Sequence, residues 1–283
     1  MDWLYSIDWL TDYKLPIGKW AKQIFTWLND NGGPVFEFLR FIMQSVIDGC
    51  LFVLTETPPL LIIAAFLGLT WYLQRSWKTV ALVALSFLFI LNQGYWDETM
   101  QSMTLILLSC VTCMGFGVPL GIMAAHRPRF YRAVSPVLDM MQTLPTFVYL
   151  IPAIVFFGIG MVPGLIATVI FVLPAPIRLT HLGVSSTPTA LLEAATAFGA
   201  TPSQRLWKVE LPWALPQIMV GLTQSIMLSL SMVVIATMVG ANGLGTPVVR
   251  ALGTVDTRLG FESGFIIVVV AIMLDRMLKV TRA

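Results

Sequence analysis

Charged residues are scarce in this sequence, because aspartate, glutamate, lysine and arginine together make up only 11% of its 283 residues. A soluble domain carries about 25% charged residues, so this composition excludes an ordinary soluble protein. Hydrophobic residues reach 57%, and the mean hydropathy is +0.82. The composition therefore predicts an integral membrane protein that is surrounded mainly by the lipid bilayer.

Other residue types are also rare, and each absence excludes a class of protein. The three cysteines give no disulfide framework, and Cys110 and Cys113 form a C-x-x-C within an apolar segment, where we interpret both as packing residues. The two histidines, His126 and His181, lack metal-ligand spacing, so no metal site is expected. The net charge is +2 and no basic run is present, so nucleic acid is not an expected partner.

Nucleotide-binding and catalytic motifs are missing as well. The sequence contains no G-x-x-x-x-G-K-[ST], so this chain does not cradle nucleotide phosphates by that device. It has no metal cluster, no nucleophile–base pairing and no cofactor motif, so we expect no enzyme activity and no cofactor in this chain. The N-terminus is acidic and aromatic, and no cleavable signal peptide is expected.

Long apolar segments are the dominant feature of the sequence. A helix needs about 20 apolar residues to cross the hydrocarbon core of a bilayer, which is about 30 Å thick. The apolar segments predict an all-α protein with about seven transmembrane helices, at residues 57–73, 78–95, 102–125, 134–158, 162–183, 213–240 and 262–280. The first two are near the lower length limit, and six or eight spans are the alternatives. The chain is thus divided into residues 1–56 and a transmembrane domain of residues 57–283.

Residues 1–56 are predicted to form an amphipathic region in the membrane interface. Apolar side chains in residues 1–33 share one helical face, and the tryptophans favour interfacial depth. Asn31-Gly-Gly-Pro34 predicts a break in the helix. Residues 35–55 look apolar but carry one polar stripe, so we expect a second interfacial or bundle-packed helix. The stripe consists of Glu37, Arg40, Gln44 and Asp48.

The basic residues predict the orientation. With seven spans, most of them fall on one side of the membrane, which the positive-inside rule assigns to the cytoplasm. These residues are Arg75, Lys78, Arg127, Arg129, Arg132, Arg205, Lys208, Arg276, Lys279 and Arg282. The other side receives Asp97, Glu98 and the N-terminal region. We therefore expect a multi-pass protein with its N-terminus outside and its C-terminus in the cytoplasm.

A polar interruption at residues 184–212 separates two apolar segments and is predicted to hold two short helices. Thr187 is the expected N-cap of the first helix, and Gly199 its C-terminal stop. Thr201–Gln204 has the spacing of a capping box for the second helix, which Pro212 is expected to end. Small side chains keep the first helix thin, so that another protein could approach its backbone. Without further information, the residue pattern supports equally well a solvated loop helix that lies on the lipid headgroups and contacts no other protein.

The same interruption resembles the cytoplasmic coupling loop of ABC-importer permeases. The pattern Glu-Ala-Ala, three residues, Gly, nine residues and aliphatic-x-Leu-Pro is matched by Glu193, Ala194, Ala195, Gly199, Val209, Leu211 and Pro212. This resemblance implies the type I ABC importer permease fold. It also implies that the loop, with Gln204 and Arg205, docks into a cleft on ATP-binding cassette ATPase subunits, which hold ATP and magnesium. One coupling loop per chain implies a second copy of this chain in the complex.

Residues 95–280 resemble the quaternary-amine branch of these permeases. The similarity is carried by Pro136–Pro145, Phe147–Pro152, Phe157–Gly160 and Met227–Val234. It implies a permease of the bacterial cytoplasmic (inner) membrane that imports glycine betaine, choline, trimethylamine N-oxide or a similar solute, with an extracytoplasmic substrate-binding protein as partner. The alternative is an ion-coupled secondary transporter, which the scarcity of charges inside the spans disfavours.

Polar and aromatic residues within the spans are candidates for the transport pathway, although packing is the simpler role for an aromatic side chain. The candidates are Gln142, Tyr149, Thr223, Gln224 and Ser229. Asp139 and Arg178 are expected to form a structural ion pair, because a carboxylate within the membrane is costly unless it is paired. A gate is the alternative role for that pair. Gly117 and Gly121 have G-x-x-x-G spacing, which permits close helix contact.

Overall fold

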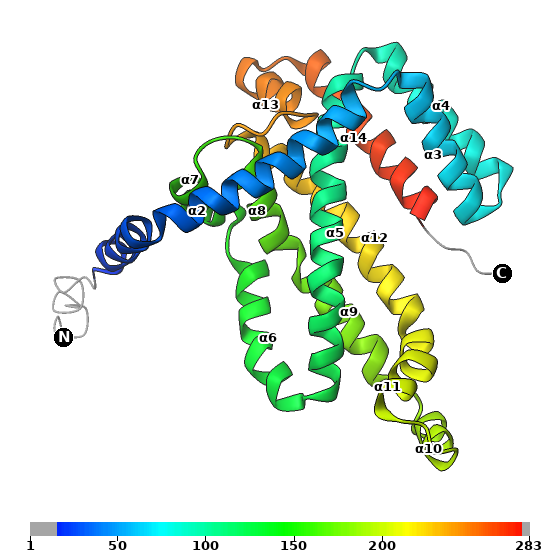
Figure 1. Cartoon of the computed structure of the whole chain (residues 1–283). Helices are drawn as coiled ribbons and strands as arrows, with labels where there is room; N and C mark the ends of the chain where they lie inside the picture. Colours follow the sequence, from blue (N-terminus) through cyan, green and yellow to red (C-terminus); the bar gives the residue numbers. More distant parts are fainter. Residues whose placement is uncertain (1–15, 279–283) are drawn as a thin grey trace, which may run out of the picture.

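The computed structural model describes residues 16–278, and all regular structure in that range is helical (Figure 1). The helices in chain order are α2 (Ile17–Thr55), α3 (Pro59–Gln74), α4 (Trp77–Gln93), α5 (Trp96–His126), α6 (Pro128–Thr143), α7 (Thr146–Phe157), α8 (Met161–Val172), α9 (Pro174–Ser185), α10 (Thr189–Ala197), α11 (Pro202–Arg205), the π-helical turn η2 (Leu206–Glu210), α12 (Leu211–Thr237), α13 (Gly245–Thr254) and α14 (Thr257–Leu278). The prediction of an all-α membrane protein is confirmed.

Five helical stretches in residues 16–278 are long and apolar enough to cross a membrane. They are Gly18–Thr55, Trp96–His126, Met161–Ser185, Pro202–Thr237 and Thr257–Leu278. A sixth span results if α6 and α7 are counted together, and α3 and α4 are shorter apolar helices at the positions of the two shortest predicted spans. Four of the five long stretches correspond to predicted spans, whereas the first lies in the N-terminal region.

The predicted break at residues 31–34 is wrong, because α2 is one continuous helix of 39 residues with Pro34 inside it. Aromatic packing explains this continuity. Phe25 and Phe36, which lie before and after Pro34, both contact Phe156 of α7, with ring centroids 5.7 Å and 4.5 Å away. These contacts hold both halves of α2 on the same neighbour, and they outweigh the local preference of Gly and Pro. The interfacial position of residues 1–56 stays a prediction, and residues 1–15 lie outside the described part of the chain.

The predicted span at residues 134–158 is divided into two helices. It consists of α6 and α7, which are bent by 96° relative to each other. Proline disfavours a helical conformation of the preceding residue, and Leu144, which precedes Pro145, is extended with ψ 136°. The hydroxyl group of Tyr149 contacts the carbonyl oxygens of Met140, Met141 and Leu144. Pro145 therefore sets the bend, and the Tyr149 hydroxyl group donates to the Met141 carbonyl oxygen, whose helical donor would be the N–H that Pro145 lacks.

The centre of the molecule is a bundle in which α5 packs along α9 and α12 (Figure 1). Two glycines of α5 permit the close approach of α9. A Cβ atom at Gly121 would lie 2.6 Å from Thr180 Cβ and 2.7 Å from the Ile177 carbonyl oxygen, and one at Gly117 would lie 2.8 Å from Pro176 Cγ. The predicted close helix contact is thus confirmed. In Figure 1, α10 and α11 project from the lower end of this bundle, and α13 lies at the upper end.

Candidate functional site

The polar interruption forms an arm at the end of the bundle, which we call the α10–η2 arm and define as residues 189–210 (Figure 1). Every residue of α10 is exposed or half-buried, and Ala194 and Ala195 keep this helix thin. Glu193 is exposed beside an open hollow of ≈ 360 Å³, which is lined by Leu192, Glu193, Thr196, Ala197 and Arg205. The arm also exposes 92% of Phe198 and 68% of Trp207. An exposed apolar surface of this kind is typical of a protein-binding site.

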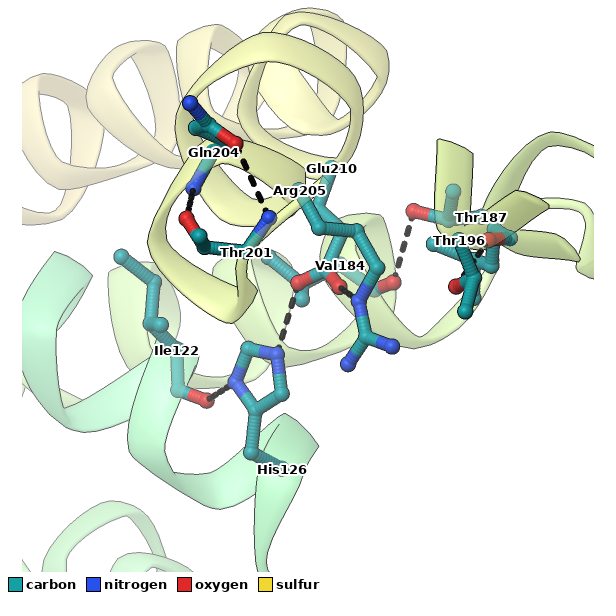
Figure 2. Close-up of polar contacts among 10 residues, drawn as sticks. Ile122, His126, Val184, Thr187, Thr196, Thr201, Gln204, Arg205 and Glu210 are labelled. Atoms are coloured by element: carbon teal, nitrogen blue, oxygen red, sulfur yellow. Dashed lines mark hydrogen bonds and ion pairs between the residues drawn. The ribbon is translucent and has the colours of Figure 1, made fainter. Parts of the chain in front are cut away.

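The two predicted helix ends inside the arm are confirmed. Gly199 has φ +75°, a conformation that favours glycine, and its N–H donates to the carbonyl oxygen of Thr196. Thr201 and Gln204 then form a complete capping box, in which each side chain accepts a hydrogen bond from the backbone N–H of the other residue, at 3.3 Å and 2.9 Å (Figure 2). The turn between α10 and α11 is therefore fixed by local chemistry.

The predicted role of Thr187 as an N-cap is wrong. Its side chain is buried, and its hydroxyl group donates to the carbonyl oxygen of Val184 at 2.9 Å (Figure 2). The N-cap position of α10 belongs to Pro188, which makes no side-chain capping bond. Thr187 therefore satisfies an acceptor near the end of α9 instead of a donor at the start of α10.

The prediction that Pro212 ends a helix is also wrong, because the helical chain continues from Pro202 to Thr237. Proline lacks an N–H and its ring normally clashes with the carbonyl group four residues earlier. That carbonyl group belongs to Lys208, inside the π-helical turn η2, where the N–H of Leu211 bonds to the carbonyl oxygen of Leu206. The wider turn accommodates Pro212 without ending the helix. Val209 and Leu211 are half-buried, and Leu211 packs on Val184, Ala214 and Ile218 of the bundle.

A charged cluster joins the arm to α5. Glu210, the last residue of η2, is buried, and its side chain is only 4% exposed. Its Oε1 accepts a hydrogen bond from Arg205 Nε at 3.0 Å, and its Oε2 lies 2.7 Å from Nε2 of His126, the last residue of α5 (Figure 2). The other ring nitrogen of His126 lies 3.0 Å from the Ile122 carbonyl oxygen. No sequence pattern indicates this cluster, because Arg205 and Glu210 lack the i,i+4 spacing of a helical ion pair and His126 lies 84 residues before Glu210.

The predicted pathway residues do not gather at one place. Ser229 is buried, and its hydroxyl group lies 2.8 Å from that of Ser109 on α5. Gln224 is exposed, because five residues along an α-helix lead to a different side of α12. Tyr149 is buried at the α6–α7 bend, whereas Thr223 and Gln142 are half-buried. Their role in transport stays a prediction.

The two residues of the predicted ion pair lie together. Nη2 of Arg178 on α9 is 2.5 Å from Oδ1 of Asp139 on α6. The Asp139 side chain is 60% exposed and that of Arg178 is 34% exposed. The pair connects α6 to α9, and its role as a structural ion pair or a gate stays a prediction.

With this geometry established, comparisons with known proteins identify the family. Residues 117–279 match the family model of the "binding-protein-dependent transport system inner membrane component". This region includes the whole α10–η2 arm and both α9 and α12. The chain belongs to this family. It is a multi-pass inner-membrane transport permease. The matched residues include the region that resembles the coupling loop.

Individual relatives support this assignment over nearly the whole chain. The glycine betaine/carnitine transport permease protein GbuB of Listeria monocytogenes is 44% identical over 266 residues, which cover 93% of this chain and 94% of that protein. The glycine betaine transport system permease protein OpuAB of Bacillus subtilis is 44% identical over 264 residues, with 93% of each chain covered. The trimethylamine N-oxide transport system permease protein TmoV of Ruegeria pomeroyi is 33% identical over 279 residues, which cover 93% of this chain and 42% of that protein.

Solved structures confirm the type I ABC importer permease fold. An inward-facing conformation of the MetNI methionine ABC transporter matches with a TM-score of 0.58 and 24% identity, and covers 69% of this chain and 98% of that chain. A second crystal form of the same transporter gives a TM-score of 0.57 over 64% of this chain. The ion-coupled secondary transporter, our alternative, is not favoured by these comparisons.

Proposed function

We propose that this permease imports glycine betaine or a closely related methylated amine, driven by ATP hydrolysis in partner subunits. The observation that carries the proposal is the 44% identity to two glycine betaine permeases over more than nine tenths of both chains. The lower identity to a trimethylamine N-oxide permease, 33%, ranks that solute second. Choline remains a solute to be tested beside them.

The α10–η2 arm is the proposed docking site for an ATP-binding cassette ATPase, which would hold ATP and magnesium. Glu193 lies beside an open hollow on a thin, exposed helix, and Phe198 offers an apolar anchor at its end. Residues beyond the turn, from Gln204 to Pro212, join this surface to the bundle. One arm per chain, with two ATPase subunits, corresponds to a two-fold dimer of this permease.

The orientation proposed for the chain has the arm and the C-terminus in the cytoplasm and the N-terminus outside. Arg127, which follows α5 directly, and Arg205 of the arm lie at the same end of the bundle, since His126 contacts Glu210. Basic residues are enriched on the cytoplasmic side of membrane proteins. The opposite end, where α13 lies, is then available to the substrate-binding protein (Figure 1).

Substrate selection is proposed to lie mainly with that substrate-binding protein. A methylated ammonium group is held by the faces of several aromatic rings through cation–π attraction. In the permease, the hydroxyl group of Tyr149 already contacts main-chain carbonyl groups at the α6–α7 bend. A low-specificity pathway through the membrane is consistent with a receptor that makes the choice of solute.

Reconstitution tests this proposal directly. The permease, its cognate ATPase and its substrate-binding protein are placed in liposomes, and uptake of radiolabelled glycine betaine, trimethylamine N-oxide and choline is measured with and without internal ATP. We expect ATP-dependent uptake with glycine betaine preferred, and unchanged uptake when ion gradients are dissipated by ionophores. Uptake without the ATPase, or uptake that stops with the ion gradients, would contradict ATP-driven import.

A further inference from the structure

The buried carboxylate of Glu210 has no role in the docking surface described above. Its side chain is 4% exposed, although a buried carboxylate is costly unless it is paired and hydrogen-bonded. Glu210 has two partners, and they belong to different parts of the molecule. Arg205 belongs to the arm, whereas His126 ends α5, which runs through the centre of the bundle (Figure 2).

The contacts form a continuous path from the docking surface to a membrane span. Arg205 lines the hollow beside Glu193 and also donates its Nε–H to Glu210. Glu210 in turn contacts His126, and Nδ1 of His126 is 3.0 Å from the Ile122 carbonyl oxygen one turn earlier in α5. The path from the edge of the hollow to α5 therefore runs through the side chains of Arg205, Glu210 and His126.

The π-helical turn is what brings Arg205 and Glu210 together. In a π-turn, residue i+5 bonds to residue i, so residues five positions apart lie close to each other along the helix. In a regular α-helix, with 3.6 residues per turn, the same two residues would point to different sides. η2 (Leu206–Glu210) begins directly after Arg205 and ends at Glu210, so it sets the spacing of these two charges. π-turns inside α-helices are frequent at functional sites.

The His126 contact has one further consequence. Nδ1 faces a carbonyl oxygen, which only accepts hydrogen bonds, so the contact is a hydrogen bond in the tautomer that has its proton on Nδ1. Nε2 faces the carboxylate of Glu210 at 2.7 Å, and this contact is favourable only if a proton lies between the two atoms. A hydrogen bond to a carboxylate is about twice as strong as one between neutral groups.

We propose that Arg205, Glu210 and His126 form a joint that transmits movement of the ATPase-docking arm to α5, and thereby couples ATP hydrolysis to opening of the pathway. The inference rests on the proposed docking of the arm and adds the positioning residues that make docking productive. No residue of α10 is buried, so apolar packing alone connects it only weakly to the spans. The joint supplies the directional contact that this surface lacks.

The test measures coupling separately from assembly. The reconstituted complex is prepared with His126→Ala, with Glu210→Gln and with both changes, and three quantities are recorded: ATPase bound to the permease, ATP hydrolysed, and glycine betaine taken up. We expect normal ATPase binding and continued hydrolysis in each variant, with uptake per ATP reduced about fivefold or more. The double variant should be no worse than the more severe single one, because both changes break the same contact. His126→Lys, which restores a cationic donor, should recover part of the uptake per ATP.

Glu262→Gln is the matched control, since Glu262 also accepts a bond from an arginine, Arg258, but in an exposed pair on α14. It should leave uptake per ATP unchanged. The joint is refuted if His126→Ala keeps the wild-type ratio, or if the two changes act independently and their effects multiply. If Glu210→Gln fails to assemble, the uptake per ATP of His126→Ala tests the joint by itself, because this variant leaves the pair of Arg205 and Glu210 intact.

A second experiment distinguishes failure of this inference from failure of the proposed function. Gly199→Trp in the same preparation should prevent ATPase binding altogether. If Gly199→Trp blocks binding while His126→Ala keeps normal uptake per ATP, the docking proposal stands and the joint is wrong. If Gly199→Trp binds the ATPase and transports normally, docking on the arm is wrong, and the joint is overturned with it.

Discussion

The α10–η2 arm and the α5–α9–α12 bundle meet at Glu210, yet glycine has a different role in each of them. The bundle brings backbones into contact through glycine, so that Gly121 of α5 faces Thr180 and the Ile177 carbonyl group of α9 with no room for a side chain. The arm exposes its glycine, and a Cβ at Gly199 would meet no atom within 4 Å. The same residue type serves dense packing in one region and a sharp, accessible turn in the other. The closely packed bundle and the exposed surface of the arm thus lie next to each other in the chain.

The largest effect should come from filling the bundle contact. In Gly121→Leu the new side chain has to displace backbone atoms, which we expect to destabilise the fold by more than about 3 kcal/mol. The variant should be lost from the monodisperse peak in size-exclusion chromatography of the detergent-purified protein. Gly115→Leu on the same helix is the control, because Gly115 is exposed with no atom within 4 Å of a Cβ. Equal losses in the two variants would contradict the proposed contact.

The next effect concerns the arm. Gly199→Trp should leave the protein in the membrane but reduce ATP-dependent uptake to background, since the indole ring projects from the proposed docking surface. Gly199→Ala is the control for backbone strain, because both variants place a side chain at φ +75°, which costs about 1–2 kcal/mol. We expect Gly199→Ala to keep most of its uptake. A similar loss in both variants would assign the defect to the backbone of the arm and not to docking.

A smaller effect is expected from the capping box. Thr201→Ala removes the acceptor for the N–H of Gln204 and should destabilise the start of α11 by about 1 kcal/mol. Hydrogen–deuterium exchange should become faster in residues 201–206 and stay unchanged in the centre of α12. Ser203→Ala, one position before Gln204 and exposed, is the matched control. Faster exchange throughout α12 would show that the arm and the bundle are not separable.

The smallest effect is predicted for the ion pair of α6 and α9. Asp139→Asn removes a charge that is 60% exposed, and exposed ion pairs contribute about 0.2–1 kcal/mol. The thermal unfolding temperature of the purified permease should therefore change little, and uptake should remain near the wild-type level. A strong loss of uptake at normal stability would instead favour the alternative in which Asp139 and Arg178 act as a gate.

Local features of the fold could be read from the sequence. Thr201 and Gln204 are three residues apart, and Gly199 precedes them, so the turn of the arm follows from neighbours along the chain. The apolar lengths of α5, α12 and α14 likewise depend only on composition within each segment. In the N-terminal helix the same reasoning failed at Pro34, because contacts of Phe25 and Phe36 with α7 overrode the local signal.

By itself, the sequence determined that this is a helical membrane protein with an alanine-lined, glycine-ended motif between two spans. Hydropathy, caps and motif spacing are properties of adjacent residues, so they need no knowledge of the fold. Only the tertiary structure decided that Phe25 and Phe36 keep α2 continuous through Pro34 and that η2 turns Glu210 toward His126, 84 residues away. Those outcomes depend on which helices pack together and at what distance, because a buried charge is stable only where the fold supplies its partners.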